Sequence, residues 1–326
     1  MTRDITPAAP EGGQPPCPVC GTAANYEYSG RDLMFNLHRR YDYHRCECCG
    51  LAFQYPPPDA VTIASFYPPH YDIYDEQRRE RKIGGLRRAL LRHSKGYRHL
   101  PAGLANRILA AICSPFMASD TPDFVTDGRM LDVGCGNGRY LTTMRALGWQ
   151  IQGVEFSPEG VRVCRMGNVP VHHGDLGSAQ FPDDHFDLIT ARHVIEHVPE
   201  PRFFIAELAR ILKPGGLLVV ETPNANALGR AWLSTNWFAN EVPRHLFMHS
   251  PASLDWLAKH AGLTSAGFRL DTTPKIFLNS LDYILENRGT PSRKVRWRRL
   301  VARLYVWLAQ RAGRGDVIHA SYRKPS

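Results

Sequence analysis

Short apolar runs alternate with helical patterns through the middle of the chain. Their starts lie at intervals of roughly 20 to 30 residues, the spacing of repeated strand–helix units. Strands joined by helical crossovers form a parallel sheet with right-handed connections, and ligands bind at the carboxyl ends of its strands. The predicted strands cover residues 129–133, 150–155, 169–172, 186–191 and 216–221.

The segments between these strands begin and end like helices. Ser157-Pro158 provides a capping hydroxyl and a proline at the first helical position, and Gly167 follows the last turn. Ser250-Pro251 opens another helix in the same way. The predicted helices cover about residues 138–147, 158–166, 201–212 and 251–261.

The first predicted strand runs into a glycine-rich turn at residues 131–138 (LDVGCGNG). Its three glycines allow a tight turn and the close approach of a ligand to the backbone. Glu155 stands 21 residues after Gly134, at the end of the next strand, where a ribose-binding carboxylate is expected. Arg139 occupies the position at which a dinucleotide site prefers glycine. The turn therefore indicates a nucleoside ligand other than a dinucleotide.

Further motifs follow the later strands in order. This series resembles that of class I S-adenosylmethionine (SAM)-dependent methyltransferases with a core of the type 11 and type 12 kind. The resemblance covers about residues 128–225, and its E-H-V segment is typical of the small-molecule branch, which includes quinone and natural-product enzymes. The motifs after the glycine turn are residues 174–176 (GDL), 186–189 (FDLI), 192–198 (RHVIEHV) and 212–216 (LKPGG).

The resemblance implies a fold and a cofactor. The fold is an α/β, Rossmann-like sheet, mostly parallel, with helices on both faces and an antiparallel last strand. Residues 316–323 alternate as that strand should, with residues 263–270 as the strand before it. In the family, the residue matching Glu155 holds the ribose hydroxyls and the one matching Asp175 reaches the adenine amino group. The implied SAM-binding residues are Asp132, Gly134, Gly136, Gly138, Glu155, Asp175, Leu176 and Arg192.

Five of the eight cysteines lie within residues 17–49. Two C-x-x-C-G knuckles separated by 25 residues read as a zinc ribbon, although the spacer is longer than usual. We expect a structural zinc ion on Cys17, Cys20, Cys46 and Cys49; Cys48 is the spare thiol or exchanges roles with Cys46 or Cys49. A reduced cluster without metal is the alternative. A ribbon ahead of such a core resembles bacterial enzymes of sugar, polysaccharide and secondary-metabolite pathways.

Methyl transfer requires an aligned nucleophile, the exclusion of water and, for a hydroxyl or amine, removal of a proton. His193 and His197 follow the fourth strand and are the predicted catalytic residues, because histidine titrates near neutral pH. A helix here would place both on one face; each could instead only shape the pocket or bond the backbone. Further candidates on the substrate side are His245, His249, Trp232, Trp237 and Phe238.

The net charge of +9 is unevenly distributed. Residues 78–99 carry nine Lys or Arg and one Glu, and residues 293–314 carry eight and no acid, so the remainder of the chain is at −7. These segments, with Arg296, Arg299 and Arg303, attract an anionic membrane or RNA, or are solvated helix faces. Trp297, Leu300, Val301, Leu304 and Leu308 recur at helical spacing and either pack internally or meet a membrane surface.

The predicted organisation is a disordered leader (1–16), a zinc-ribbon module (17–58), a basic helical linker (59–125) and a methyltransferase domain (126–326) with a helical insertion at about 272–315. No apolar run reaches the roughly 18 residues of a membrane helix, so a cytoplasmic protein, in contact with a membrane at most peripherally, is expected. The predicted function is SAM-dependent methyl transfer to a small-molecule or glycan- or lipid-precursor acceptor. An RNA methyltransferase and a non-enzymatic SAM-fold adaptor are the alternatives; acceptor atom and oligomeric state stay open.

Overall fold

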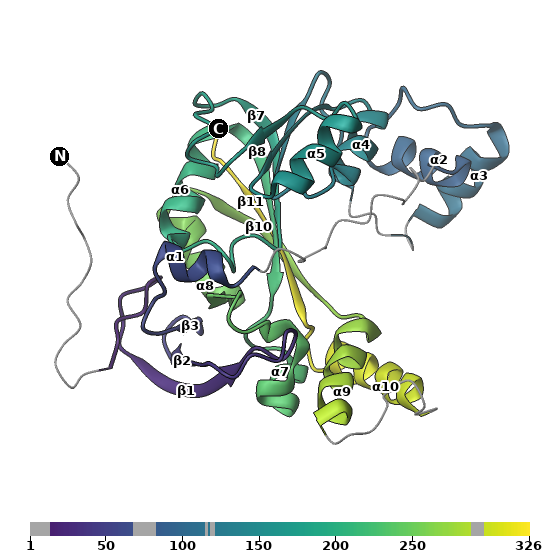
Figure 1. Ribbon diagram of the computed structural model, residues 1–326. Helices are drawn as coiled ribbons and strands as arrows, with labels where there is room; N and C mark the ends of the chain where they lie inside the picture. The colour runs from purple at the N-terminus through teal and green to yellow at the C-terminus, as the bar shows by residue number, and fades with distance from the viewer. Residues whose placement is uncertain (1–13, 68–82, 115–116, 118–120, 288–296) are drawn as a thin grey trace. The chain divides into compact units, whose positions relative to one another are not determined.

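The computed structural model describes residues 14–67, 83–114, 117, 121–287 and 297–326 (Figure 1). The expectations for residues 1–13, for the basic residues at 78–82 and for Arg296 lie outside the described residues. Contacts within the chain divide it into two compact units. Unit 1 consists of Met1–Tyr71, Ala191–Ala209 and Leu217–Ser326, and unit 2 of Asp72–Thr190 and Arg210–Gly216. The domain boundaries predicted from the sequence stay a prediction.

A seven-stranded sheet in the order β10-β11-β8-β7-β4-β5-β6 confirms the predicted α/β fold. Strands β4, β5 and β6 are parallel, whereas β11 is antiparallel to both β8 and β10. The predicted antiparallel last strand is therefore present. The strands are β4 (Arg129–Val133), β5 (Gln150–Glu155), β6 (Val171–His173), β7 (Phe186–Arg192), β8 (Leu212–Pro223), β10 (Thr264–Asp271) and β11 (Val317–Arg323).

The helices of unit 2 include two that connect its parallel strands. Gly138, in the left-handed region at φ 70°, precedes one of them, and the Ser157 hydroxyl caps the other with Pro158 at its first turn. Their apolar faces bury residues such as Leu141 and Val161. The helices are α2 (Gly85–Ser94), α3 (Leu104–Cys113), α4 (Arg139–Ala146) and α5 (Pro158–Met166).

Unit 1 contains a second, four-stranded sheet in the order β1-β2-β3-β9. Its first three strands, β1 (Ala24–Arg31), β2 (Arg40–Cys46) and β3 (Ala52–Gln54), belong to the cysteine-rich segment. Its fourth strand, β9 (Phe247–Met248), comes from far along the chain and pairs antiparallel with β3. The cysteine-rich segment therefore shares its sheet and part of its core with later residues.

The other helices of unit 1 include two that pack on one another, α9 and α10 (Figure 1). Ala302, Tyr305 and Ala309 of α10 are buried in that contact. A second stripe, which begins at the N-cap residue Trp297 and continues along α10, is more than half exposed, with Trp297, Leu300, Leu304 and Trp307 at 52, 70, 54 and 52%. The helices are α1 (Ala60–Ser65), α6 (Pro201–Ile211), α7 (Leu228–Leu233), α8 (Pro251–His260), α9 (Pro274–Asn287) and α10 (Arg298–Arg311), with 3-10 turns η2 (Ser234–Asn236) and η3 (Phe238–Asn240).

Among the described residues of the range predicted as a helical insertion, α9 and α10 are helical, and the apolar residues of α10 are divided between an inner and an outer face. Among the helices that the structure describes, none combines the length and apolarity needed to cross a bilayer.

Candidate active site

The glycine turn after β4 has the backbone conformation that its composition predicts. Gly134, Gly136 and Gly138 all have positive φ, at 67, 57 and 70°. At Gly138 a Cβ atom would lie 2.9 Å from the Cys164 sulfur, so a larger residue would be both strained and crowded. The turn therefore requires glycine on conformational grounds, whatever it binds.

Glu155, at the end of β5, holds this turn in place. One carboxylate oxygen accepts from the Gly136 amide at 2.7 Å, and the other accepts from the Ser157 amide at 2.8 Å. The side chain is buried, with 6% of the residue exposed. Hydrogen bonds to a carboxylate are stronger than those to a neutral acceptor. Glu155 therefore fixes the spacing between the glycine turn and the start of α5.

The two predicted aspartates lie in different surroundings. Asp132 is buried, and its carboxylate accepts from the Thr190 hydroxyl of β7 at 2.5 Å. Asp175 is exposed and accepts from the Ser178 amide at 2.7 Å, which closes a short turn, and the neighbouring Leu176 is buried. The structure thus places a loop with an exposed carboxylate and a buried leucine after β6, and a buried carboxylate near the end of β4, before the glycine turn.

Two buried cysteines, Cys135 within the glycine turn and Cys164 of α5, were not singled out from the sequence. The Cys164 thiol donates to the Gly136 carbonyl at 3.3 Å, and its sulfur lies 3.8 Å from that of Cys135. A Cβ atom on Gly153 would lie 2.6 Å from the Cys135 sulfur. Compact sulfur-containing side chains therefore support the turn, and the sequence offers no local signal for this contact because the two cysteines are 29 residues apart.

His193 and Glu196 follow β7 in a bend and a turn, so the helix considered for this stretch is wrong. His193 has a φ of 56°, which is uncommon outside glycine, and its amide donates to the Glu221 carbonyl at 2.8 Å. Its Nδ1 lies 3.2 Å from a Glu196 oxygen. The ring is half exposed, at 53% of the side chain. Helical spacing therefore does not relate His193 to His197.

Glu196 is fully buried and also accepts from the Thr222 hydroxyl at 3.0 Å. Burial alone would raise the pKa of Glu196, but the hydrogen bond and charge of His193, with the charges of His197 and His245, lower it to about 2. Burial alone would lower the pKa of His193. The hydrogen bond and the charge of Glu196 outweigh this effect and raise that pKa above its ordinary value. Glu196 is thus an ionised group at the centre of a histidine cluster.

His197 is held by oxygen atoms on one side of its ring. Its Nδ1 lies 3.0 Å from the Arg244 carbonyl oxygen and 3.1 Å from the Tyr67 hydroxyl oxygen. Burial raises the pKa of Tyr67 to about 12, so its hydroxyl stays protonated near neutral pH. Neither Tyr67 nor Arg244 was identified from the sequence, because each is far along the chain from His197.

The other predicted substrate-side residues are mostly interior. The His245 Nδ1 donates to the Ala239 carbonyl at 2.8 Å, and burial lowers the pKa of both His245 and His249 to about 4. Trp237 is 1% exposed and packs in the core, so it does not line an open acceptor site, whereas Trp232 is 54% exposed. Donor atoms of Glu196, His197 and His245 all lie within 4.8 Å of one another, which is compatible with a metal ion.

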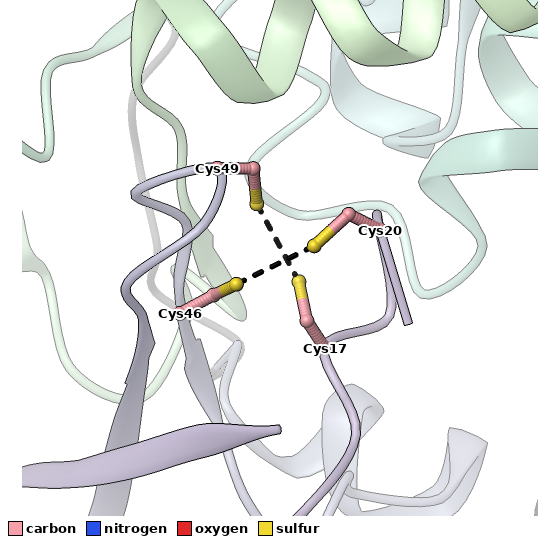
Figure 2. A group of neighbouring side chains, drawn as sticks. All are labelled: Cys17, Cys20, Cys46 and Cys49. Carbon is pink, nitrogen blue, oxygen red and sulfur yellow. Dashed lines mark hydrogen bonds between the residues drawn. The ribbon is translucent and has the colours of Figure 1, made fainter. Parts of the chain in front are cut away.

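The four cysteines expected to bind zinc converge in unit 1 (Figure 2). The Cys17 and Cys49 sulfurs are 3.6 Å apart, those of Cys20 and Cys46 are 3.4 Å apart, and all four lie within 4.8 Å of one another. A tetrahedral zinc site with Zn–S bonds of about 2.3 Å needs sulfurs about 3.8 Å apart. Cys48 is exposed and outside the cluster. The donor set therefore fits a closed, four-thiolate site.

The two knuckles have the same backbone. The Gly21 amide donates to the Cys17 carbonyl at 2.8 Å, and the Gly50 amide donates to the Cys46 carbonyl at 2.9 Å. Both glycines have positive φ, at 80 and 71°. The hydrogen bond with Cys49 lowers the pKa of Cys17 to about 5, in spite of burial. The repeated turn therefore presents two thiols from each knuckle.

Comparison with known proteins gives a family. A profile described as a methyltransferase domain matches residues 74–266, more than half of the 326 residues. Two similar curated proteins are ubiquinone biosynthesis O-methyltransferases. The one from Xanthomonas oryzae pv. oryzae is 36% identical over 127 residues, 36% of this chain and 52% of that protein. The one from Chromobacterium violaceum is 28% identical over 181 residues, 49% of this chain and 78% of that protein.

The chain thus spans about half the length of the Xanthomonas relative. A solved SAM-dependent methyltransferase from Archaeoglobus fulgidus is 19% identical, with a TM-score of 0.45, over 67% of this chain and 94% of that one. The matched residues include the glycine turn, Glu155 and the turn after β7. The chain belongs to the methyltransferase-domain family, and its domain is of the class I, SAM-dependent kind.

Proposed function

We propose that this protein transfers the methyl group of SAM to a small-molecule or glycan- or lipid-precursor acceptor by in-line displacement. The observation that carries the proposal is Glu155, a buried carboxylate that holds the backbone of a three-glycine turn at the end of a parallel strand. This is the arrangement that a nucleoside cofactor with ribose hydroxyls requires. The curated relatives act on oxygen, which favours a hydroxyl acceptor.

The residues present fit SAM. When bound, SAM supplies a methyl group on a sulfonium, which is an excellent leaving group. The glycine turn admits a ligand close to its backbone because Gly134, Gly136 and Gly138 carry no Cβ. Glu155 is proposed to bind the ribose hydroxyls, and Asp175 with Leu176 the adenine. Gly134, Gly136 and Gly138, with Asp132 and Arg192, are proposed as the other SAM-binding residues.

His193 and His197 are proposed to remove the acceptor proton. Each has its Nδ1 engaged with an oxygen, by Glu196 in one case and by the Arg244 carbonyl in the other. An Nδ1–H that donates leaves Nε2 unprotonated in the neutral ring, so Nε2 is the basic atom of both side chains. General-base assistance contributes about 10²- to 10⁴-fold to such reactions.

The test measures release of S-adenosylhomocysteine with pools of phenolic, sugar and amine acceptors. His193→Gln and His197→Gln should lower kcat at least about tenfold with unchanged SAM affinity. His260→Gln is the matched control. The His260 Nδ1 also lies near a backbone carbonyl, 2.7 Å from the Trp256 oxygen, but this side chain is exposed on α8. Calorimetric binding of NAD and not of SAM would overturn the proposal.

We further propose that the four-cysteine cluster holds one structural zinc ion. Four thiolates leave no open coordination position, so the ion would stabilise the module and take no part in the reaction. The convergence of Cys17, Cys20, Cys46 and Cys49, with sulfurs near the tetrahedral spacing, supports this assignment.

An anionic membrane is the proposed partner of the basic segments. In α10 the exposed stripe of Trp297, Leu300, Leu304 and Trp307 lies beside Arg299 and Arg303, and no acid occurs in residues 297–314. In α3, which contacts α2, Leu104, Ile108 and Ile112 are 71, 55 and 64% exposed at intervals of one helical turn. Residues 83–114 carry six Lys or Arg and no acid. Exposed aliphatic stripes flanked by arginine suit an anionic lipid surface.

Pelleting with phosphatidylglycerol vesicles tests the membrane proposal. Binding should fall with Leu300→Ser plus Leu304→Ser and with Ile108→Ser, whereas Val61→Ser, which removes an 81% exposed side chain on α1, should not change it. Equal binding to phosphatidylcholine vesicles, or salt-sensitive RNA binding without vesicle binding, would overturn it.

A further inference from the structure

The cysteine-rich segment is bonded directly to the loop that holds His197. Strand β3 pairs with β9, with Ala52 opposite Met248. The Gln54 amide donates to the Leu246 carbonyl at 2.9 Å, and the Tyr43 hydroxyl donates to the His245 carbonyl at 2.9 Å. Backbone and side-chain bonds therefore fix the loop to this segment along its length.

A buried ion pair completes the connection. The Arg244 guanidinium donates to both carboxylate oxygens of Asp32, at 2.7 and 3.3 Å. The two side chains are 0 and 1% exposed, so water does not compete for these bonds. Asp32 also accepts from the Met34 and Phe35 amides, which ties it to the turn between β1 and β2. The Arg244 Nε also donates to Glu241 of its own loop at 3.1 Å, so Asp32 and Glu241 together set the position of the guanidinium.

Arg244 in turn determines which ring nitrogen of His197 carries the proton. A carbonyl oxygen can only accept, so the contact of 3.0 Å between it and Nδ1 requires Nδ1 to be protonated. The Tyr67 oxygen, 3.1 Å from the same nitrogen, can accept from that proton as well. A change in the backbone at Arg244 would remove the contact that selects this tautomer.

We propose that Asp32 and Arg244 are positioning residues for methyl transfer, through which the cysteine-rich segment holds His197 with Nδ1 protonated and Nε2 basic. This inference rests on the proposed role of His197 as a base. It assigns the segment a function in the reaction instead of in nucleic-acid binding. The Asp32 carboxylate holds the Arg244 guanidinium, which fixes the position of Arg244. The Arg244 carbonyl in turn orients the His197 imidazole.

The test is a direct measurement of the tautomer. Full-length protein labelled with 15N-histidine gives ring 15N shifts that distinguish Nδ1–H from Nε2–H, and His197→Gln identifies the signal. The wild type should show the Nδ1–H form. Asp32→Asn and Arg244→Lys should give mixed tautomers and lower kcat at least about tenfold, with the SAM dissociation constant within about twofold of the wild-type value. Asp32→Glu, which keeps the charge, should recover part of the loss.

A matched control is an ion pair that joins the cysteine-rich segment to α7. Glu27 of β1 accepts from both terminal nitrogens of Arg230, at 2.7 and 2.6 Å, and Arg230 lies in α7, outside the loop at Arg244. Glu27→Gln should lower stability without changing the His197 tautomer. If Asp32→Asn fails to fold, Arg244→Lys and Asp32→Glu decide the question by the same spectra.

Three results would overturn the proposal: an Nδ1–H signal that persists in folded Asp32→Asn or Arg244→Lys, a wild type in the Nε2–H form, or an equal tautomer change in Glu27→Gln. The spectra need no acceptor. A wild type that shows the expected tautomer but no methyl transfer would therefore reject the proposed function alone.

Discussion

Replacement of Glu155 by glutamine tests the cofactor site most directly. The carboxylate accepts from two backbone amides, those of Gly136 and Ser157, at 2.7 and 2.8 Å. Glutamine has only one acceptor oxygen, so its NH2 group must face one of these N–H donors. A buried donor left without a partner costs about 1–3 kcal/mol, and a hydrogen bond to a charged group contributes about 1.5–3 kcal/mol. We expect the free energy of unfolding to fall by about 2 kcal/mol.

The same change should weaken SAM binding at least about tenfold, because about 1.4 kcal/mol of lost interaction corresponds to a factor of ten. Calorimetry with SAM and urea denaturation followed by tryptophan fluorescence measure the two effects. Asp175→Asn is the matched control for stability, since its remaining oxygen can still accept from the Ser178 amide in an exposed turn. Wild-type SAM affinity in Glu155→Gln would refute the proposed role of the carboxylate.

Three further predictions follow from other parts of the structure. Metal analysis of freshly reduced protein should give one zinc per chain, lost in Cys20→Ser and retained in Cys48→Ser; two per chain would point to the cluster around Glu196. Burial lowers the pKa of His249 to about 4, below its value of about 6.5 in the unfolded chain. Between these two pH values the unfolded chain binds more protons than the folded protein, so the free energy of unfolding should fall as the pH decreases from about 6.5 to 4. That loss should be smaller in His249→Gln, as measured by urea midpoints at pH 7 and 5. Gly138→Ala should destabilise the protein by about 2–4 kcal/mol, through a left-handed backbone and a clash with Cys164, in thermal denaturation.

The alternation of strands and helices is a local property of the sequence, which explains why the sheet could be predicted. Strand β4 is buried from Met130 to Val133, β5 is buried in its second half, and Ser157-Pro158 or Gly138 defines the neighbouring helix end. The four cysteines that converge also share a local signal, the repeated C-x-x-C-G turn.

The surroundings of the histidines could not be predicted, because they depend on contacts between distant residues. Arg244 meets Asp32 across 212 residues, and Tyr67 meets His197 across 130. The positive φ at His193 could not be predicted either, because i, i+4 spacing carries no information about the backbone conformation of a single residue. Likewise, the presence of two tryptophans in one segment does not predict that Trp237 is buried in the core and Trp232 is exposed.

The pairing of β3 with β9 limits where this chain can be cut. The family match begins at residue 74, but a polypeptide begun there would lack the strand that covers Phe247 and Met248. Met248 and Trp237, now 0 and 1% exposed, would lose their contact with Ala52, and the Leu246 carbonyl would lose the Gln54 amide. An uncovered strand edge beside apolar side chains promotes aggregation. The boundary drawn by similarity is therefore not a boundary of folding, and truncations or fusions of this protein should retain residues 14–67.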